Sequence, residues 1–431
     1  MNLTPPIHQG EKPRWRRATR LKSLVAAGAI AIGFAGVGLA VSGPAHADPA
    51  VNYVAVGSDT IQDVMNGFAL LEGNVLGSYN AVNPVTAVAH EVITPSKVPF
   101  GSTAPLTSCS FTRPNGSTEG AAALDYSLTQ NATNLNALAP PLVSNPPGSG
   151  CVDVGRSSSA PKTNCATVLC QSATGGLVYV PFALDAVAGA IGPTSVLTNA
   201  GMFTSSGTPA SNPGDLQNLY GNCIAVTEGG VTYWPQGSNQ TRPAGSVVID
   251  LYMPQNGSGT EKFWAGKVGV TLASDGSFNS TQFPCVHQTI LAGPSTGSAV
   301  EEHDGTAYNS DPNGYGPFSI AQFIAQTNGF GVNRLHGVVL ENINGVSPFN
   351  ASGQLNTAYP YTREVYNVAA TDRVVNGIDS NFDSVLSGLL NGSTSALCKA
   401  TITIKQYGFA TLSASTPDLC GSTATTLRAV E

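Results

Sequence analysis

The stretch that decides the expected fold is VNYVAVGSDTIQDVMNGFALLEG, residues 51–73. Residues 52–56 have the β-branched and aromatic content of a buried strand. A short polar loop, residues 57–60, follows, and the residues after it repeat apolar side chains at the spacing of one helical face. These apolar residues are Ile61, Val64, Met65, Phe68 and Leu71. The stretch therefore predicts a strand that enters an amphipathic helix through a tight polar loop.

Ser58, Asp59 and Thr60 lie in this loop, at the expected start of the helix. The first-turn amides of a helix have no intrahelical partner and the helix dipole is positive at that end, so such a loop can hold an anion. The alternative is an ordinary turn in which one of these side chains only caps the helix. Three further loops of the same kind favour the anion site.

The three further loops combine glycine and hydroxyl side chains in the same way. They are NGSTEG at residues 115–120, GRSSSAP at residues 155–161 and NGSGT at residues 256–260. Arg113 precedes the first of them and Arg156 lies inside the second, where each can supply positive charge. The other residues of these loops that we expect to contact a ligand are Gly116, Ser117, Ser158, Ser159, Ser258, Gly259 and Thr260.

Strand-like and helix-like segments alternate along the rest of the chain, which is typical of an α/β fold. Residues 177–191 and 247–252 are apolar runs that predict buried strands. Residues 317–326 have a proline near the start and apolar residues at helical spacing, which predicts a helix. Ser117 or Thr118 is expected to cap another helix. With 431 residues and 42% hydrophobic content, the chain is long enough for two lobes.

The N-terminal segment has the pattern of a secretory signal peptide. Six basic residues precede a neutral, apolar run at residues 24–41, and small residues flank a cleavage point after Ala47. Residues 1–47 are therefore predicted to be removed, so that the mature, exported chain begins at Asp48. An uncleaved membrane anchor is the alternative, because the apolar run is long. No cysteine lies near the cleavage point to carry a lipid, so we expect an extracellular or periplasmic protein without a lipid anchor.

The charge balance excludes some partners. The full chain has a formal net charge of −7. Removing residues 1–47 takes away six basic residues and one acidic residue, which leaves 13 basic against 25 acidic residues and a charge of −12. A surface this acidic argues against nucleic acid as a partner. An anionic ligand must then be held by local dipoles and a few placed arginines.

All eight cysteines lie in the exported part, and an even number in an exported chain indicates disulfides. Zinc is less favoured, because no CxxC pair or cysteine–histidine cluster has the spacing of a metal site. Sequence alone does not fix the connectivity. Pairing neighbours gives Cys109–Cys151, Cys165–Cys170, Cys223–Cys285 and Cys398–Cys420.

The ordered series of loops resembles the phosphate-binding branch of the type II periplasmic binding proteins, the extracytoplasmic solute receptors of ABC transporters. NGSGT at residues 256–260 is similar to the family's Asp-Gly-Ser-Gly-Thr loop and is the most specific match. The resemblance implies a two-lobed α/β fold of the Venus-flytrap type with a ligand cleft between the lobes. Lobe I would comprise residues 48–179 and 360–431, and lobe II residues 180–359. The hinge would lie near Pro181 and near Tyr359 and Pro360.

The resemblance also implies a function. The chain would capture a small oxyanion, phosphate first, and deliver it as a monomer to an ABC permease, with no catalysis, cofactor or metal. Two departures leave the identity of the ligand open. Ser159 stands where the family's phosphate receptors have an aspartate, and Pro254 stands where they have an arginine. Phosphate or a phosphorylated small molecule is the first expectation, and another oxyanion or an unrelated solute is the alternative ligand.

Two other classes of protein are alternatives. One is a secreted binding or interaction protein with no transporter. The other is an extracellular serine hydrolase, because GPSTG at residues 293–297 matches the GxSxG pattern and His303 stands beside Glu301 and Glu302. A proline inside that turn and the frequency of Gly and Ser in this chain disfavour the hydrolase. A ligand contact from the segment around His303 is the better expectation.

Overall fold

Two long strands, β6 (Leu177–Ile191) and β13 (Thr362–Ala370), organise the fold of this computed structural model. They pair antiparallel along nearly the whole of β13. The residues of β6 are buried until its last position, as expected for an apolar run that is covered on both faces. At about 3.3 Å per residue the strand spans roughly 50 Å, which is long enough to run through two hydrophobic cores.

The structure describes residues 50–73, 75–99, 102–106, 109–163, 165, 167–205, 213–273 and 276–431. The predicted signal peptide, residues 1–47, lies outside these described residues. Among the helices of the described ranges, none has the length and apolar character needed to cross a membrane.

The other strands are β1 (Tyr53–Gly57), β2 (Leu76–Ser78), β3 (Val92–Ile93), β4 (Phe111–Thr112), β5 (Val154–Ser157), β7 (Val226–Glu228), β8 (Val231–Pro235), β9 (Val247–Tyr252), β10 (Val286–His287), β11 (Gly314–Ser319), β12 (Val339–Glu341), β14 (Ala410–Thr411) and β15 (Arg428–Ala429). The α-helices are α1 (Gln62–Leu71), α2 (Ser117–Thr129), α3 (Ala132–Leu138), α4 (Asp215–Tyr220), α5 (Gly259–Val268), α6 (Thr306–Ser310), α7 (Ile320–Thr327), α8 (Thr371–Val374), α9 (Ser384–Leu390), α10 (Ala396–Lys399) and α11 (Thr401–Gln406). Short 3₁₀ helices are η1 (Pro140–Leu142), η2 (Ala200–Met202) and η3 (Thr425–Leu427).

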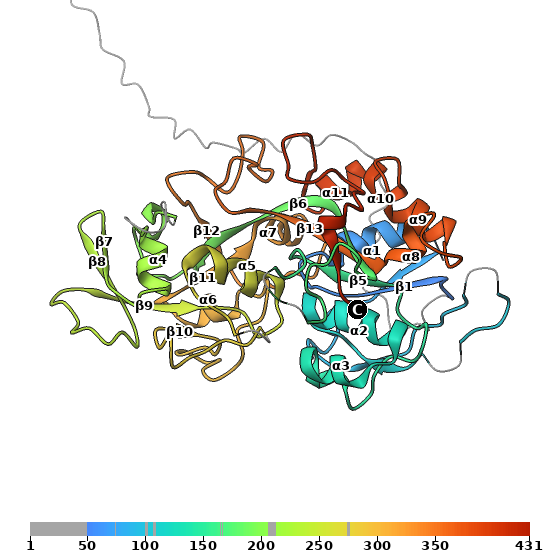
Figure 1. The fold of residues 1–431 in the computed structure, drawn as a ribbon. Coiled ribbons are helices and arrows are strands. Elements are labelled where there is room, and N and C mark those ends of the chain that lie inside the picture. Colours follow the sequence, from blue (N-terminus) through green and yellow to red (C-terminus); the bar gives the residue numbers. More distant parts are fainter. Residues whose placement is uncertain are drawn as a thin grey trace, which may run out of the picture. The chain divides into compact units, whose positions relative to one another are not determined.

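One mixed sheet links most of these strands. Its order is β2-β1-β5-β13-β6-β11-β9-β8-β7, and β10, β12, β14 and β15 add at its sides. Strands β2, β1 and β5 are parallel at one end, and β11, β9 and β8 are parallel at the other. The antiparallel pair β6 and β13 joins these two ends. Figure 1 shows β6 and β13 between the elements around β1 and α2 and the elements around β9 and β11. The α/β class predicted from the alternating segments is confirmed.

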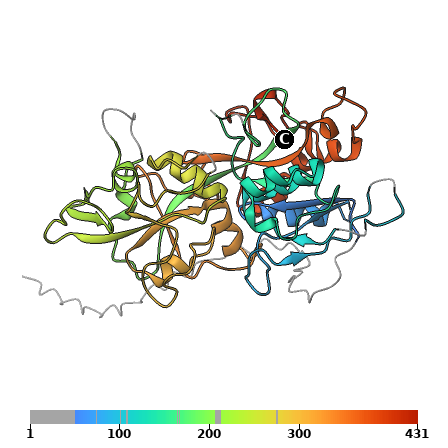
Figure 2. The ribbon, with the colours of Figure 1, turned by 60° about the horizontal axis from the view of Figure 1, so that its bottom comes forward.

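Two separate hydrophobic cores cover the two ends of this sheet. The first includes Val54, Phe68, Leu124, Val178 and Val368. The second includes Val187, Tyr233, Leu251, Trp264 and Tyr315. The fold is therefore two-lobed, and we call the part around the first core lobe I and the part around the second core lobe II. Figure 2 shows the C-terminal segment beside the N-terminal strands and helices, as expected if both contribute to the first core.

The boundary residues predicted for the lobes stay a prediction, but β6 and β13 show where the cores meet. Phe182 and Ala183 of β6 belong to the first core, and Ala186 and Val187 belong to the second. The pairing register of the two strands shifts between Val365, which is opposite Ala183, and Tyr366, which is opposite Pro181. Both strands therefore pass from lobe to lobe within a few residues of one another.

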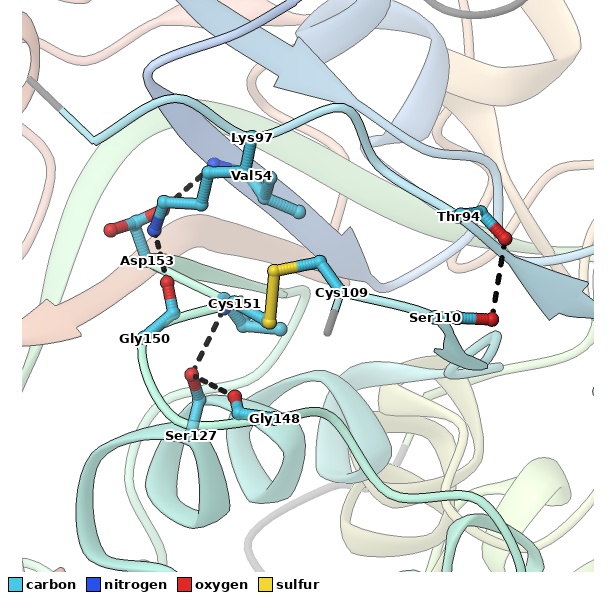
Figure 3. Close-up of a disulfide and its surroundings, with 11 residues drawn as sticks. Val54, Thr94, Lys97, Cys109, Ser110, Ser127, Gly148, Gly150, Cys151 and Asp153 are labelled. Atoms are coloured by element: carbon cyan, nitrogen blue, oxygen red, sulfur yellow. Dashed lines mark hydrogen bonds and ion pairs between the residues drawn. A yellow bond between two sulfur atoms is a disulfide. The ribbon is translucent and has the colours of Figure 1, made fainter. Parts of the chain in front are cut away.

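Four disulfides tie the chain together, and they are the four expected from pairing neighbours. Cys109–Cys151 and Cys165–Cys170 lie in lobe I, and the other two are Cys223–Cys285 and Cys398–Cys420. Figure 3 shows Cys109–Cys151 beside a buried ion pair. There the Lys97 ammonium donates to the Asp153 carboxylate (2.6 Å), whose Oδ2 also accepts from the Val54 amide (2.9 Å).

Two local predictions are wrong. Residues 317–319 do not begin a helix, because they complete strand β11, and α7 starts after them with Ser319 as its cap. The predicted side-chain caps of α1 and α2 are also absent. The cap position of α1 is Ile61 and that of α2 is Gly116, and neither helix has a side-chain cap hydrogen bond. The hydroxyl groups next to these helix starts are therefore available for longer-range contacts.

Candidate functional site

The centre of the candidate site is an ion pair at the crossing of the lobes. Arg363 of β13 lies directly opposite Asp185 of β6 in the strand register. Its Nε and Nη2 atoms donate to Asp185 Oδ2 at 3.1 and 2.9 Å, and both side chains are buried. Asp185 Oδ1 accepts from the Ser319 hydroxyl at 2.8 Å and the Ala321 amide at 3.1 Å. These contacts fix the guanidinium between the two lobes.

Two threonines, one from each lobe, meet at this guanidinium. Arg363 Nη2 donates to Thr260 Oγ1 at 2.9 Å and to Thr60 Oγ1 at 3.3 Å. Both hydroxyls in turn donate to one carboxylate oxygen, Glu302 Oε1, at 2.5 and 2.7 Å. Arg363 Nη1 has no hydrogen-bond partner among the described residues, although the side chain is only 6% exposed. A buried donor without a partner is costly unless something else satisfies it.

Glu302 and His303 complete the centre. The His303 Nε2 atom lies 3.0 Å from Glu302 Oε1 and 2.8 Å from Thr60 Oγ1. Because the Ser319 amide donates to Nδ1 at 3.4 Å, we assign the ring proton to Nε2. His303 has φ +59°, an uncommon conformation for a residue with a side chain. The expected ligand-contact segment around His303 therefore reaches the same centre as the two threonines.

The electrostatics of Glu302 follow from these contacts. Burial raises the pKa of this carboxyl, but the His303 ring, the Arg363 guanidinium and the Thr260 hydroxyl together hold the pKa well below its ordinary value. The group is therefore an ionised carboxylate at neutral pH. Its Oε2 atom has no partner among the described residues. A negatively charged oxygen thus occupies the point where both threonine hydroxyls converge.

The second and third loops meet the start of α5 beside this centre. Ser117 Oγ accepts from the Ser158 amide at 3.0 Å and lies 3.2 Å from Ser158 Oγ. A methyl group on Gly259 would lie 2.1 and 2.4 Å from these two hydroxyl oxygens, so only glycine allows this approach. Likewise, a methyl group on Gly116 would lie 2.8 Å from the Gly257 carbonyl oxygen. The glycines expected in the site bring the loops of the two lobes into contact.

Ser58 and Ser258 have different environments. Both side chains are fully buried. Ser258 Oγ accepts from the Thr260 and Glu261 amides at 3.1 Å each, so it is the cap of α5. Ser58 Oγ has no partner among the described residues. Ser58 therefore presents an unused hydroxyl, whereas the Ser258 hydroxyl oxygen already stabilises its own helix.

The remaining predicted site residues have structural partners. The buried Arg156 donates through Nη2 to the Gly57 and Tyr79 carbonyls at 3.0 and 2.5 Å, and through Nη1 to Ser78 Oγ at 2.7 Å. Arg113 Nη1 donates to the Asn80 carbonyl at 2.6 Å. Asp59 pairs with Arg334 of lobe II at 3.0 Å instead of capping α1. The Ser159 amide donates to Ser157 Oγ at 3.3 Å.

Sequence reasoning did not assign Arg363 and Asp185 to the site. Asp185 has a signal in the sequence, because it is a charged residue within the apolar run LVYVPFALDAVAGAI at residues 177–191. Arg363 has none, since it is one of several polar residues in its segment. The strand register that sets these two side chains opposite one another connects positions 178 residues apart.

The segment that suggested a serine hydrolase does not have the geometry of a nucleophile elbow. GPSTG at residues 293–297 forms exposed turns, without the strand and helix that flank a nucleophile elbow. In the part of the chain that the structure describes, no group of three histidine, cysteine, aspartate or glutamate side chains could hold a metal ion. The described site offers hydrogen-bond donors and charge.

The solved structures to which this chain is similar include binding proteins. A phosphate ABC transporter substrate-binding protein from Clostridium perfringens, solved with bound phosphate, is 13% identical with a TM-score of 0.41, and the match covers 84% of this chain and 99% of that chain. A phosphate transport receptor from Vibrio cholerae is 15% identical with a TM-score of 0.41, over 84% and 100%. A phosphate-binding protein from Stenotrophomonas maltophilia is 14% identical with a TM-score of 0.33, over 84% and 90%.

No family model matches the sequence, and none of the curated proteins matches it. The fold assignment rests on the sheet order and the two cores described above.

Proposed function

We propose that this protein reversibly captures a small oxyanion between its two lobes, with phosphate as the first candidate. The observation that carries the proposal is the convergence of four hydroxyl-rich loops, far apart in sequence and drawn from both lobes, beside one buried guanidinium. Thr60 and Thr260 contact Arg363 directly, and Ser117 and Ser158 contact the start of α5. Hydroxyls and helix N-termini are the groups that hold a dehydrated anion.

The arrangement supports binding by opening and closure. In the closed arrangement described here, Glu302 engages the threonine hydroxyls that an anion would use. Separation of the lobes would release Thr60 from Glu302 of lobe II and admit the ligand. Hydrogen bonds to an ionised group contribute on the order of 1.5–3 kcal/mol each. Several of them would give micromolar or tighter binding after the entropy of association is subtracted.

We also propose the lobe boundaries of the protein and the place where it acts in the cell. Lobe I would comprise residues 48–179 and 360–431, lobe II residues 180–359, and residues 1–47 would direct export. The exported protein would work outside the cytoplasm as a monomer, without a lipid anchor, and would deliver its ligand to an ABC permease. The four disulfides agree with an oxidising compartment.

Calorimetric titration of the purified protein with phosphate and with sulfate, after exhaustive removal of bound ligand, tests this function. The variant Thr260→Val keeps the side-chain shape but removes the donor, so we expect a 10- to 100-fold loss of affinity, equal to about 1.4–2.7 kcal/mol. The exposed Thr227 of β7 provides the matched control Thr227→Val, which should bind normally. Ser258→Ala is a poorer probe, because it also removes the cap of α5.

The titration can support or contradict the proposed oxyanion site. Phosphate binding that Thr260→Val weakens and Thr227→Val does not would support the oxyanion site. A folded protein, with an intact thermal unfolding transition, that releases no heat with either anion would contradict it.

A further inference from the structure

A cavity of 440 Å³ opens beside the anion loops. From lobe I it is lined by residues 157 and 159–163, and from lobe II by Lys262 of α5 and residues 272–273. Ser117 and Ser159, which belong to the second and third predicted anion loops, lie on its surface. Ser117 also lies 3.2 Å from Ser158 Oγ, so the cavity borders the pair of serine hydroxyls that approach Gly259.

The cavity is too large for an inorganic oxyanion alone. Its volume is many times the roughly 10–15 Å³ of such space that one water molecule needs. It falls in the range of roughly 300–1,000 Å³ that is typical of sites for organic ligands. A five-atom tetrahedral ion bound at the loops would leave most of this space to water. The volume therefore indicates a ligand with a second, larger part.

The walls of the cavity indicate what that part is. Ser117 and Ser159 contribute polar surface, whereas Pro161, Leu169 and Leu272 contribute apolar surface. A cavity with mostly apolar walls and a few grouped polar atoms suits a ligand that has a polar head and a carbon-rich body. Such a ligand would place its head on the hydroxyl groups and its body against the apolar walls.

Lys262 adds positive charge to the same cavity. This residue of α5 is half-buried, and its ammonium group contacts the Thr118 hydroxyl across the lobes. Burial and the like charge of Lys162 lower the pKa of Lys262. Both effects disfavour the ammonium form, and a bound anion would offset them. The cavity therefore favours a negatively charged head on its ligand.

We propose that the natural ligand is a phosphate monoester of a small, partly apolar alcohol, whose organic group fills the cavity between residues 157–163 and residues 262–273. This inference rests on the proposed function and adds the substrate class to it. The phosphate head would be held by the hydroxyl loops, and the alcohol part would lie against Leu169 and Leu272. Inorganic phosphate would then be a weaker, truncated ligand.

The test compares three probes by calorimetry on the same purified protein: inorganic phosphate, phenyl phosphate and phenol. We expect phenyl phosphate to bind at least tenfold more tightly than inorganic phosphate, and phenol not to bind. Equal or weaker binding of phenyl phosphate, with inorganic phosphate bound, would overturn the inference and leave the proposed function in place. Binding of none of the three would overturn both. Binding of phenol alone would show an apolar site with no anion recognition and would also overturn the inference.

Substitutions that narrow the cavity test whether the organic group of the ligand lies in it. Ala160 and Ala273 line opposite walls and are exposed, so each can be enlarged without disturbing a core. In Ala160→Trp and in Ala273→Trp, the ratio of phenyl phosphate to inorganic phosphate affinity should fall to within about threefold of one. The matched controls Ala160→Ser and Ala273→Ser should keep the original ratio. A ratio that neither tryptophan changes would place the organic group elsewhere and overturn the inference. Because the two walls are independent, misfolding of one variant leaves the other decisive.

Discussion

At the scale of single residues, Glu302 is the side chain that most affects how an anion could bind. Its ionised carboxylate accepts from Thr60 and Thr260 and lies beside His303. These are the contacts that an oxygen of a bound oxyanion would make. Under the proposed function, Glu302 stands where a ligand oxygen would bind, and its charge would repel an anion at the same point.

The variant Glu302→Gln tests this role. Removing the charge should raise the affinity for phosphate by about tenfold or more, because like charges a few ångströms apart repel by several kcal/mol at the effective dielectric constant of a protein. Calorimetric titration of wild-type and variant protein measures the change. Glu301→Gln, at the neighbouring position, is the control and should leave affinity within about twofold. A tenfold loss in Glu302→Gln would instead show that the carboxylate contacts the ligand favourably.

Local sequence patterns predict some residues of the candidate site and miss others. The hydroxyl loops at Thr60, Ser117, Ser158 and Thr260 were predicted from local patterns, and the structure brings them together. Arg363 was not assigned to the site, because its place follows from the pairing of two strands. A local pattern reports which groups a loop carries, but a cross-strand partner depends on a register that spans most of the chain.

At the scale of elements, helix starts show the limit of local rules. In the NGSGT loop a side chain does cap a helix, because α5 begins at Gly259 with Ser258 as its cap. The same rule fails at α1, where Asp59 pairs with Arg334 of the other lobe. A cap stabilises by about 1 kcal/mol, so a buried contact between lobes can outweigh it. Capping propensity therefore predicts a helix start better than it predicts the partner of a given side chain.

Helix α5 offers a matched pair of glycines for a test of lobe contact. A methyl group on Gly259 would lie 2.1 Å from Ser158 Oγ and 2.4 Å from Ser117 Oγ, whereas a methyl group on Gly266 would meet nothing within 4 Å. Gly266→Ala should stabilise the helix by up to about 1 kcal/mol. Gly259→Ala should keep the lobes apart, lower phosphate affinity at least tenfold and increase the radius of gyration in small-angle X-ray scattering.

The two variants separate helix propensity from lobe contact. Both make the same chemical change in the same helix, so a difference between them reports the environment of Gly259. Equal ligand affinity and equal radius of gyration in the two variants would contradict the contact between α5 and the serine loops.

At the scale of the whole molecule, the order of motifs along the chain was enough to predict a two-lobed α/β fold. The four disulfides agree with the pairing of neighbours because each joins cysteines within one stretch of chain, at most 62 residues apart. The convergence of residues 302–303 with Thr60 could not be predicted in the same way. It depends on how the two lobes close on one another, and that closure leaves no periodic pattern in the sequence.

Closure of the lobes also buries a carboxyl group, Asp63 of α1. A methyl group on Gly331 of lobe II would lie 2.6 Å from Asp63 Oδ2, and Arg334 of the same segment pairs with the neighbouring Asp59. Burial raises the pKa of Asp63 to about 6, and the attraction of Arg334 only partly opposes this. The closed protein therefore favours the protonated form of Asp63 more than the unfolded chain does.

The sign of the resulting pH dependence follows from this shift. Between about pH 4 and pH 6 the folded protein holds a proton on Asp63 that the unfolded chain has lost, so stability falls as pH rises through this window. Above pH 6 the full cost is present, and it is at most about 3 kcal/mol for a shift of roughly two pKa units. Asp63→Asn removes the charge and should raise the melting temperature at pH 7 but not at pH 4. The exposed Asp379 supplies the control Asp379→Asn, which should change neither value. A lower melting temperature of Asp63→Asn at pH 7 would show instead that the ionised carboxylate, attracted by Arg334, holds the lobes together.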